Sequence, residues 1–144
     1  MDWRCHQVNS PAHAIVAHGI DLVDIERIQR LLTEHGEQFL TRVFTLSEQE
    51  YARSGGVRCA ERLAVRFAAK EAVLKAIGTG LRSGMKWTDI EVSVLPSGQP
   101  IVATSGVVAN IAADRGISNW LISLSHSGGF AIASVIGTSA APTG

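Results

Sequence analysis

The segment from Cys59 to Gly80 constrains the fold of this chain most strongly, because its pattern is that of a long helix that is apolar on nearly every side. Large apolar side chains recur on one stripe, and small residues, mostly alanine, occupy most of the remaining surface. A helix of this kind has to be buried, since it has no continuous polar face for water. The sequence therefore predicts a core built around one helix over Cys59–Ile77, which Gly78 ends.

The rest of the chain is expected to surround this helix in one α+β domain. A chain of 144 residues with 46% hydrophobic content can bury one sizeable core but is too short for two ordinary domains. Period-2 patterns and turn residues predict strands over residues 14–22, 90–95, 100–103, 120–125 and 130–136. One further helix is predicted to begin at Ile25, after the cap Asp24, and to end at a break at Gly36. Three more are predicted over residues 39–44, over residues 46–51 after a Thr45–Glu48 capping box, and over residues 107–115. The domain is predicted over residues 14–138, between a loose N-terminal extension (1–13) and a frayed tail (139–144).

Composition argues against several classes of partner. Thirteen basic and thirteen acidic residues leave no net charge, so any contact with nucleic acid or an acidic partner must rest on a local patch. We expect no nucleic-acid partner and no membrane partner, since no apolar run reaches the length of a membrane span. The two cysteines, Cys5 and Cys59, form neither a CxxC pair nor a disulfide framework, which favours a reducing cytoplasm. The N-terminal segment also lacks the apolar run of a signal peptide.

Charged residues within the apolar helix are the first functional signal. Glu71 and Lys75 are four residues apart and are expected to share a face of small residues with Glu61. Lys70 points instead toward the apolar stripe, where a snorkelling lysine is expected. A carboxylate and an ammonium group beside the glycine turn Gly78-Thr79-Gly80 suit a phosphate that carries a metal ion.

Asp21, at the end of the first predicted strand, is the best second carboxylate for a hard cation. Magnesium is commonly held by one or two carboxylates together with waters and substrate phosphates. Taken singly, Asp21 is more often a turn or cap residue and Glu71 is more often an ion-pair partner for Lys75, so the metal hypothesis rests on their joint use. Lys75 beside a phosphate would neutralise the charge that builds up as a phosphoryl bond breaks.

The remaining candidates are less specific when taken alone. Gly78, Thr79 and Gly80 are also the ordinary way to end a helix. His126, in the predicted turn 126–129, is either a general base or phosphate donor, or an ordinary polar residue of a hairpin. The spacing of the N-terminal cysteine and histidines matches no standard zinc site, so we predict no metal there: Cys5, His6, His13 and His18.

Several blocks of this sequence, in this order, resemble the holo-acyl-carrier-protein synthases, the short phosphopantetheinyl transferases. The three main blocks are GIDLVDIERI at 19–28, RFAAKEAVLKAIGTG at 66–80 and SLSHSGGFAIASVI at 123–136, and RVFTLSEQE at 42–50 and GQPIV at 98–102 also match. The resemblance covers nearly everything from about residue 15 to residue 136. It implies the 4′-phosphopantetheinyl transferase fold.

The resemblance also implies a reaction, in which 4′-phosphopantetheine passes from coenzyme A to a serine of apo-acyl carrier protein and adenosine 3′,5′-bisphosphate is released. This activity would serve fatty-acid biosynthesis. Asp21 and Glu71 would be the magnesium-binding pair, and Lys75 would lie at the pyrophosphate. The glycine turn 78–80 would line the path of the nucleotide, with His126 near the phosphates. A bound water, Glu71 or His126 would take the serine proton.

Basic residues receive roles from the same resemblance. Arg58 and Arg66 fall where the family binds the 3′-phosphate of the nucleotide. Arg27 matches a position that meets the acidic carrier protein, and Arg30, one turn further along, could extend that patch. The family forms homotrimers whose sites are shared between subunits, which would explain an apolar helix larger than one chain readily buries.

Two departures from the family pattern and two alternatives accompany this interpretation. The usual GxGxD begins here with Ala17 in place of its first glycine, and acidic residues dilute the basic surface of the first helix: Glu26, Glu34 and Glu37. One alternative is a noncatalytic relative that binds carrier proteins or nucleotides, although the intact candidate site argues against it. The other alternative is a magnesium-dependent nucleotide phosphohydrolase, which needs no carrier protein.

Overall fold

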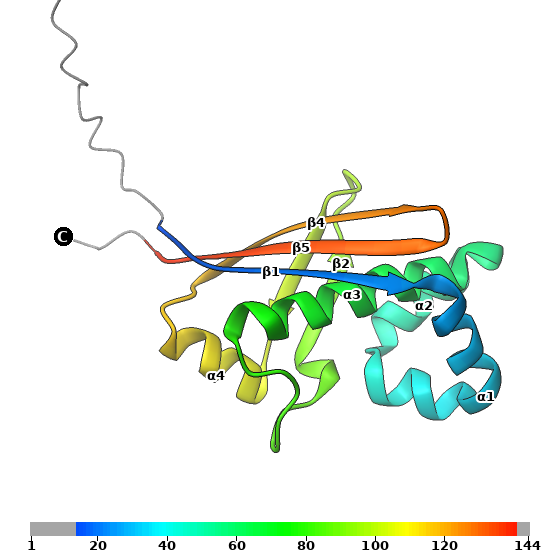
Figure 1. Ribbon diagram of the computed structural model, residues 1–144, viewed down its shortest axis with the longest axis horizontal. Coiled ribbons are helices and arrows are strands. Elements are labelled where there is room, and N and C mark those ends of the chain that lie inside the picture. The colour runs from blue at the N-terminus through cyan, green and yellow to red at the C-terminus, as the bar shows by residue number, and fades with distance from the viewer. Residues whose placement is uncertain (1–13, 141–144) are drawn as a thin grey trace, which may run out of the picture.

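The computed structural model describes residues 14–140 (Figure 1), and the predicted extension 1–13 and residues 141–144 of the predicted tail lie outside this range. The strands are β1 (Ile15–Asp24), β2 (Ile90–Val94), β3 (Pro100–Thr104), β4 (Asn119–Ser127) and β5 (Phe130–Thr138). The helices are α1 (Ile25–Val43), α2 (Leu46–Ser54), α3 (Cys59–Ile77) and α4 (Gly106–Asp114), with 3₁₀ turns at Gly56–Arg58 and Trp87–Asp89. The α+β class is as predicted.

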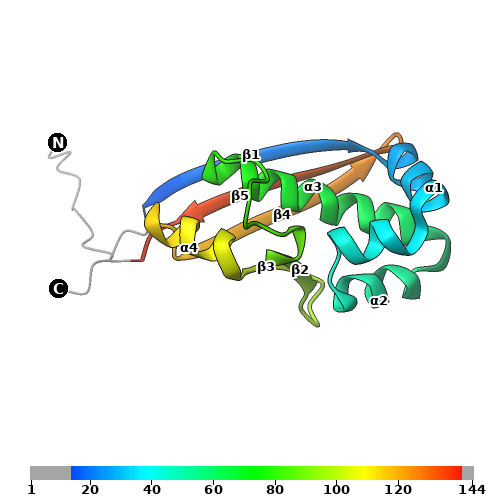
Figure 2. The same ribbon diagram turned by 90° about the horizontal axis from the view of Figure 1, so that it is seen from below.

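The main sheet has the strand order β1-β5-β4 and is antiparallel throughout, while β2 and β3 form a separate antiparallel pair. The helices lie on one face of the main sheet, as Figures 1 and 2 show, and α3 crosses that face along β1 and β5. The central strand presents small, fully buried side chains to α3, namely Ala131, Ala133 and Val135. Small residues on the sheet and small residues on α3 let the two backbones lie close together.

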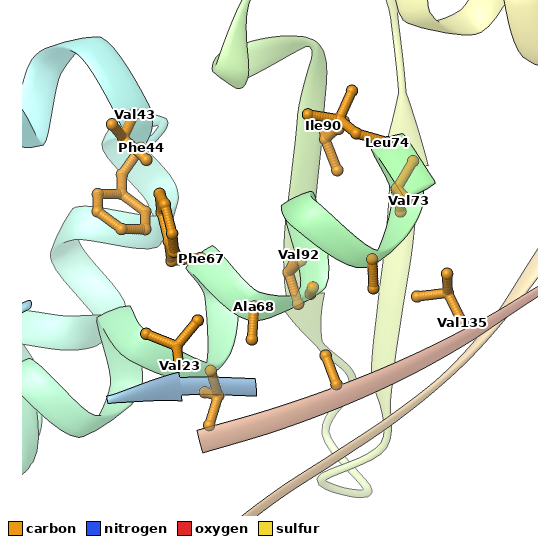
Figure 3. Close-up of a cluster of buried hydrophobic side chains, with 14 of the residues drawn as sticks. Val23, Val43, Phe44, Phe67, Ala68, Val73, Leu74, Ile90, Val92 and Val135 are labelled. Atoms are coloured by element: carbon orange, nitrogen blue, oxygen red, sulfur yellow. The ribbon is translucent and has the colours of Figure 1, made fainter. Parts of the chain in front are cut away.

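The predicted central helix is confirmed. Cys59–Ile77 is one uninterrupted helix, and most of its side chains are buried within this single chain. Figure 3 shows the core around it, where Phe67 of α3 lies beside Phe44, which follows α1, and Leu74 lies beside Ile90 of β2. Val23 of β1 and Val135 of β5 belong to the same cluster. The chain itself therefore covers α3, and partner subunits are not needed to bury it, contrary to the reason given above for expecting a trimer.

Lys70 does not snorkel, which makes that prediction wrong. Its side chain is 0% exposed, and its Nζ lies 2.7 Å from Oε1 of Glu48, whose side chain is also 0% exposed. The same ammonium donates to the carbonyl oxygens of Trp87 (3.1 Å) and Ile90 (2.5 Å). Burial lowers the pKa of Lys70, and the Glu48 carboxylate opposes that shift. A hydrogen-bonded partner on α2 thus makes full burial of this lysine possible.

The caps and turns mostly follow the predictions. Asp24 caps α1 by accepting from the N–H of Glu26 at 2.9 Å, and the Thr45–Glu48 capping box is present. Gly36, with φ +48°, separates two helical segments within α1. The hairpin turn is shorter than expected, because β4 continues through Ser127, so His126 lies on a strand and not in the turn. Within the described residues, no helix is both long and apolar enough to cross a membrane.

Candidate active site

Asp21, Lys75 and Glu71 meet at the β1 edge of the sheet, where β1 packs against α3. Asp21 points from the inner face of β1, and its side chain is 15% exposed. The Nζ of Lys75 donates to Oδ1 of Asp21 at 2.8 Å and to the carbonyl oxygen of Ile20 at 3.1 Å. Lys75 therefore has its close ion pair with Asp21 and not with Glu71 on its own helix.

Glu71 completes this cluster by charge and not by a close contact. Burial raises the pKa of Glu71 and the Asp21 carboxylate raises it further, while Lys75 and Arg27 oppose the shift. The hydrogen bond to Asp21 is the main cause that raises the pKa of Lys75. Because the Asp21 carboxylate disfavours ionisation of Glu71, a cation bound beside both carboxylates would be favoured.

The donor set fits a hard cation bound partly by substrate. Within the described part of the chain, no group of three or more His, Cys, Asp or Glu residues could hold a metal ion. A closed protein cage is therefore excluded for residues 14–140, whereas two carboxylates completed by waters and phosphate oxygens remain a good fit for magnesium. Asp21 and Glu71 are the residues that could hold it.

The glycine turn after α3 is first of all a helix cap. Gly78 has φ +75°, and its N–H donates to the carbonyl oxygen of Lys75 at 3.0 Å. The N–H of Thr79 donates to the carbonyl oxygen of Leu74 at 3.3 Å. These bonds satisfy carbonyls at the end of α3, so neither N–H is free to bind a phosphate. Gly80 has φ +60° and open space where a Cβ would stand, so a ligand can approach its backbone closely.

A pocket of about 400 Å³ lies at the other edge of the sheet, beside β4. It is bounded by the end of α2, the N-terminal half of α3, the β2–β3 connection and β4. Three of the predicted residues line it, namely Arg58, Arg66 and His126. The arginines in its lining make the pocket suitable for binding an anion.

Glu61 lies in this pocket, where its Oε1 is 3.2 Å from Nε2 of His126. The prediction that Glu61 shares a face with Glu71 and Lys75 is therefore wrong. The two acids are ten positions apart in the sequence, and α3 directs one toward β4 and the other toward β1. The contact with Glu61 favours one orientation of the His126 ring.

Tyr51 and Arg62 are among the lining residues of this pocket that sequence reasoning missed. The guanidinium carbons of Arg62 and Arg66 each lie 4.3 Å from the centroid of the Tyr51 ring. A signal for Arg62 was present, because Arg58, Arg62 and Arg66 recur at intervals of four. No comparable signal marked Tyr51, which belongs to another helix.

Arg66 is unusual for an arginine because it is almost fully buried, with 2% exposure. One of its Nη atoms donates to the carbonyl oxygen of Arg62 at 3.1 Å, whereas its Nε has no hydrogen-bond partner among the described residues. Burial lowers the pKa of Arg66, and the nearby Glu48 carboxylate opposes this shift. The pocket thus contains an incompletely satisfied cation.

The acid cluster and the arginine pocket lie on opposite edges of one sheet. Asp21 pairs with Ala133 of the central strand, and Ala133 pairs with Leu124 of β4, which lines the pocket. Helix α3 packs over the central strand, so it lies between the two groups. A single chain therefore does not bring the predicted metal pair together with Arg58, Arg66 and His126.

Arg27 and Arg30 lie in the first turns of α1, and both are exposed. The Arg27 guanidinium carbon is 6.0 Å from the Phe67 ring centroid, and its charge reaches Glu71. Arg27 therefore flanks the acid cluster, and Arg30 lies about one turn further along α1. An acidic partner on α1 would approach that cluster directly.

Comparison with known proteins identifies the family of this chain. Residues 17–135 match the family model of the 4′-phosphopantetheinyl transferase superfamily. The chain is 48% identical to a holo-[acyl-carrier-protein] synthase of Salinispora arenicola, over 85% of this chain and 97% of that protein. It is 45% identical to the protein of the same name from Geobacter metallireducens, over 85% of this chain and 96% of that protein.

Among solved structures, the chain is similar to a holo-(acyl-carrier-protein) synthase from Bacillus anthracis in complex with CoA (3′,5′-ADP). The TM-score is 0.72 and the identity is 37%, over 88% of this chain and 98% of that one. The residues that the family model matches include both the acid cluster and the arginine pocket. This chain belongs to the 4′-phosphopantetheinyl transferase superfamily.

Proposed function

We propose that this protein transfers 4′-phosphopantetheine from coenzyme A to a serine of an apo-acyl carrier protein and releases adenosine 3′,5′-bisphosphate. The observation that carries the proposal is the cluster of Asp21, Lys75 and Glu71 at the β1–α3 contact in a member of this superfamily. We further propose that the protein acts in the cytoplasm, in fatty-acid biosynthesis.

Asp21 and Glu71 would hold Mg²⁺, which supplies positive charge for the pyrophosphate when it is bound. Lys75 contacts Asp21 through an exposed ammonium group. This group would turn toward the pyrophosphate and stabilise charge on the leaving nucleotide. The serine oxygen forms a bond to the phosphorus that carries the pantetheine arm, and the bond from that phosphorus to the bridging oxygen breaks. Bound water, Glu71 and His126 remain the three candidates for the proton acceptor.

The nucleotide would lie in the arginine pocket, with Arg58 and Arg66 at its 3′-phosphate and His126 near the other phosphates. The position of Arg66 supports this role, because a buried and incompletely satisfied guanidinium favours an added dianion. The glycine turn 78–80 is still proposed to line the path of the nucleotide. It would contact the nucleotide through groups other than the N–H groups of Gly78 and Thr79. Arg27 and Arg30 are proposed to meet the acidic carrier protein beside the acid cluster.

We propose that the active form is a homotrimer in which one subunit's acid cluster faces another subunit's arginine pocket. Two observations support assembly. The two groups lie on opposite edges of the sheet within one chain, and the outer face of that sheet carries exposed apolar side chains, among them Ile20, Leu22 and Leu121. Such a face favours association with another protein surface. The number three comes from the family resemblance.

Mass spectrometry of an apo-acyl carrier protein tests the function directly. With coenzyme A and Mg²⁺, the purified protein is expected to make the carrier heavier by one phosphopantetheine arm, and chelation of the metal should stop the reaction. Asp21→Asn and Glu71→Gln are expected to lower the rate by a factor of at least about 100, because each removes a charge that the metal needs. Their circular dichroism should match that of the parent protein.

The same assay separates the alternatives. Release of nucleotide from coenzyme A in the absence of any carrier would indicate a phosphohydrolase. Binding of carrier or nucleotide without a mass shift, across several apo carriers, would indicate a noncatalytic relative. Parent-like turnover by either variant would remove that residue from the metal site.

A further inference from the structure

Arg62 is the one arginine of the pocket to which neither the sequence prediction nor the family resemblance gave a role. It lines the pocket together with Arg58 and Arg66 and is half-buried. Position 58 immediately precedes α3, so the three residues at intervals of four lie along one side of the helix. Arg62 is the middle of these three guanidinium groups.

The contacts of Arg62 hold its guanidinium group in place without using all of its donors. One Nη atom donates to the carbonyl oxygen of Tyr51 at 2.8 Å and to Oγ of Ser54 at 3.1 Å. The guanidinium also lies over the Tyr51 ring. Among the described residues, its other N–H groups have no partner, so they are available to a ligand. A guanidinium group that is already held in position loses less conformational entropy on binding a ligand than a freely rotating side chain does.

Gly55 makes this position of Arg62 possible. A Cβ built on Gly55 would lie 2.7 Å from Nε of Arg62 and 2.9 Å from its Cδ and Cζ. The backbone of Gly55, with φ −81° and ψ −7°, is one that any residue adopts. Glycine is therefore required here for the space that Arg62 occupies, and not for its own conformation.

The charges that face Arg62 leave the pocket strongly positive. Its lining contains three arginines and one carboxylate, Glu61, which is paired with His126. Glu48 offsets part of the charge of Arg66 from the buried side. No described carboxylate is close enough to pair with Arg58 or Arg62. A doubly charged anion could therefore bind these arginines without displacing a carboxylate from them.

We propose that Arg62 contacts the 3′-phosphate of the nucleotide and determines the preference of this protein for nucleotides that carry that phosphate. The proposal rests on the proposed function, which places the nucleotide in this pocket. Tyr51 and Gly55 act on the same preference through Arg62, the first by stacking on it and the second by leaving room for it. The discrimination between 3′-phosphorylated and unphosphorylated nucleotides then depends on contacts between α2 and α3.

Calorimetric titration of the full-length protein with adenosine 3′,5′-bisphosphate and with adenosine 5′-monophosphate tests this proposal without any carrier protein. The ratio of the two dissociation constants measures the contribution of the 3′-phosphate. Arg62→Ala is expected to reduce this ratio by about tenfold, the effect of one lost charge-assisted contact. Gly55→Ala should reduce it similarly, because its Cβ displaces Arg62 from the other side.

Arg53→Ala is the matched control. Arg53 lies in the same segment and carries the same charge, but it is exposed and pairs with Glu37 at 2.9 Å, outside the pocket. Its removal should leave the ratio unchanged. Unchanged affinity for adenosine 5′-monophosphate in Arg62→Ala and Gly55→Ala would show that the pocket remains folded.

The outcomes separate this inference from the proposed function. If the parent protein does not distinguish the two nucleotides, the 3′-phosphate site itself is wrong, including Arg58 and Arg66. If the parent distinguishes them and Arg62→Ala keeps the same ratio, the role of Arg62 is overturned while the proposed function stands. An equal change in Arg53→Ala would mean that only overall charge matters, and this would also overturn the proposal.

Discussion

The Lys70–Glu48 pair shows how single residues hold this fold together. Both side chains are fully buried, and Glu48 also accepts the N–H of Thr45 and the N–H of Val92, each at 2.9 Å. One ion pair thereby links α2, α3 and β2. Burying two charges is costly, and the pair is tolerated here because its remaining polar atoms are hydrogen-bonded.

At this scale, Lys70→Met is expected to destabilise the protein by about 3–5 kcal/mol, because it leaves the Glu48 carboxylate buried without its partner. Adding Glu48→Gln should recover part of the loss, since the amide oxygen can still accept a backbone N–H while the buried charge is gone. Urea unfolding at a fixed protein concentration measures both changes. A double variant less stable than Lys70→Met alone would contradict this account.

At the scale of secondary-structure elements, the contact between β1 and α3 forms the candidate metal site. A Cβ on Gly19 would overlap the carbonyl oxygen of Ala72, and α3 cannot move away without disturbing its own hydrogen bonds. Gly19 is two residues from Asp21, and Ala72 is adjacent to Glu71. The close approach that needs a glycine is thus the one that brings the two carboxylates together.

Gly19→Ala is therefore expected to push β1 away from α3, to cost about 1–3 kcal/mol of stability, and to weaken the binding of Mn²⁺ as a probe of the site. Gly137→Ala is the control, because its Cβ would meet only the Ile117 side chain, at 3.1 Å, and that side chain can shift. Thermal unfolding and Mn²⁺ titration give the two readouts. Normal Mn²⁺ affinity in Gly19→Ala would show that metal binding does not depend on the close contact between β1 and α3.

At the scale of the whole molecule, the sheet has one covered and one uncovered face. Helices cover the inner face (Figure 2), whereas the outer face exposes Leu22 (61%), Leu121 (53%) and Ile20 (49%). Ile132 and Ile136 of the central strand lie on the same outer face. The proposed trimer would cover this apolar surface and join the two separated halves of the site.

Leu22→Asp combined with Leu121→Asp is expected to give a monomer in light scattering, because a charge on each outer strand opposes burial of this face. Transfer activity should fall with assembly if the site is shared. Leu46→Asp is the control, since Leu46 is 76% exposed but lies on α2, away from the sheet. A fully active monomer would disprove the shared site.

Much of this protein is determined by local sequence. The long apolar helix, the capping box at Thr45 and the break at Gly36 all follow from residues a few positions apart, since helical periodicity and capping are short-range effects. The matching blocks likewise identify the family from local patterns. These features are therefore predictable from the amino-acid sequence alone.

Only the tertiary structure decided which partners the charged residues take. Lys75 pairs with Asp21, 54 positions away, and Lys70 with Glu48 on another helix. Packing also separated Glu61 from Glu71 and placed the arginine pocket on the opposite edge of the sheet from the acid cluster. Such pairings depend on how α3 lies on the sheet, and the sequence around each charged residue carries no information about a partner brought near by that packing.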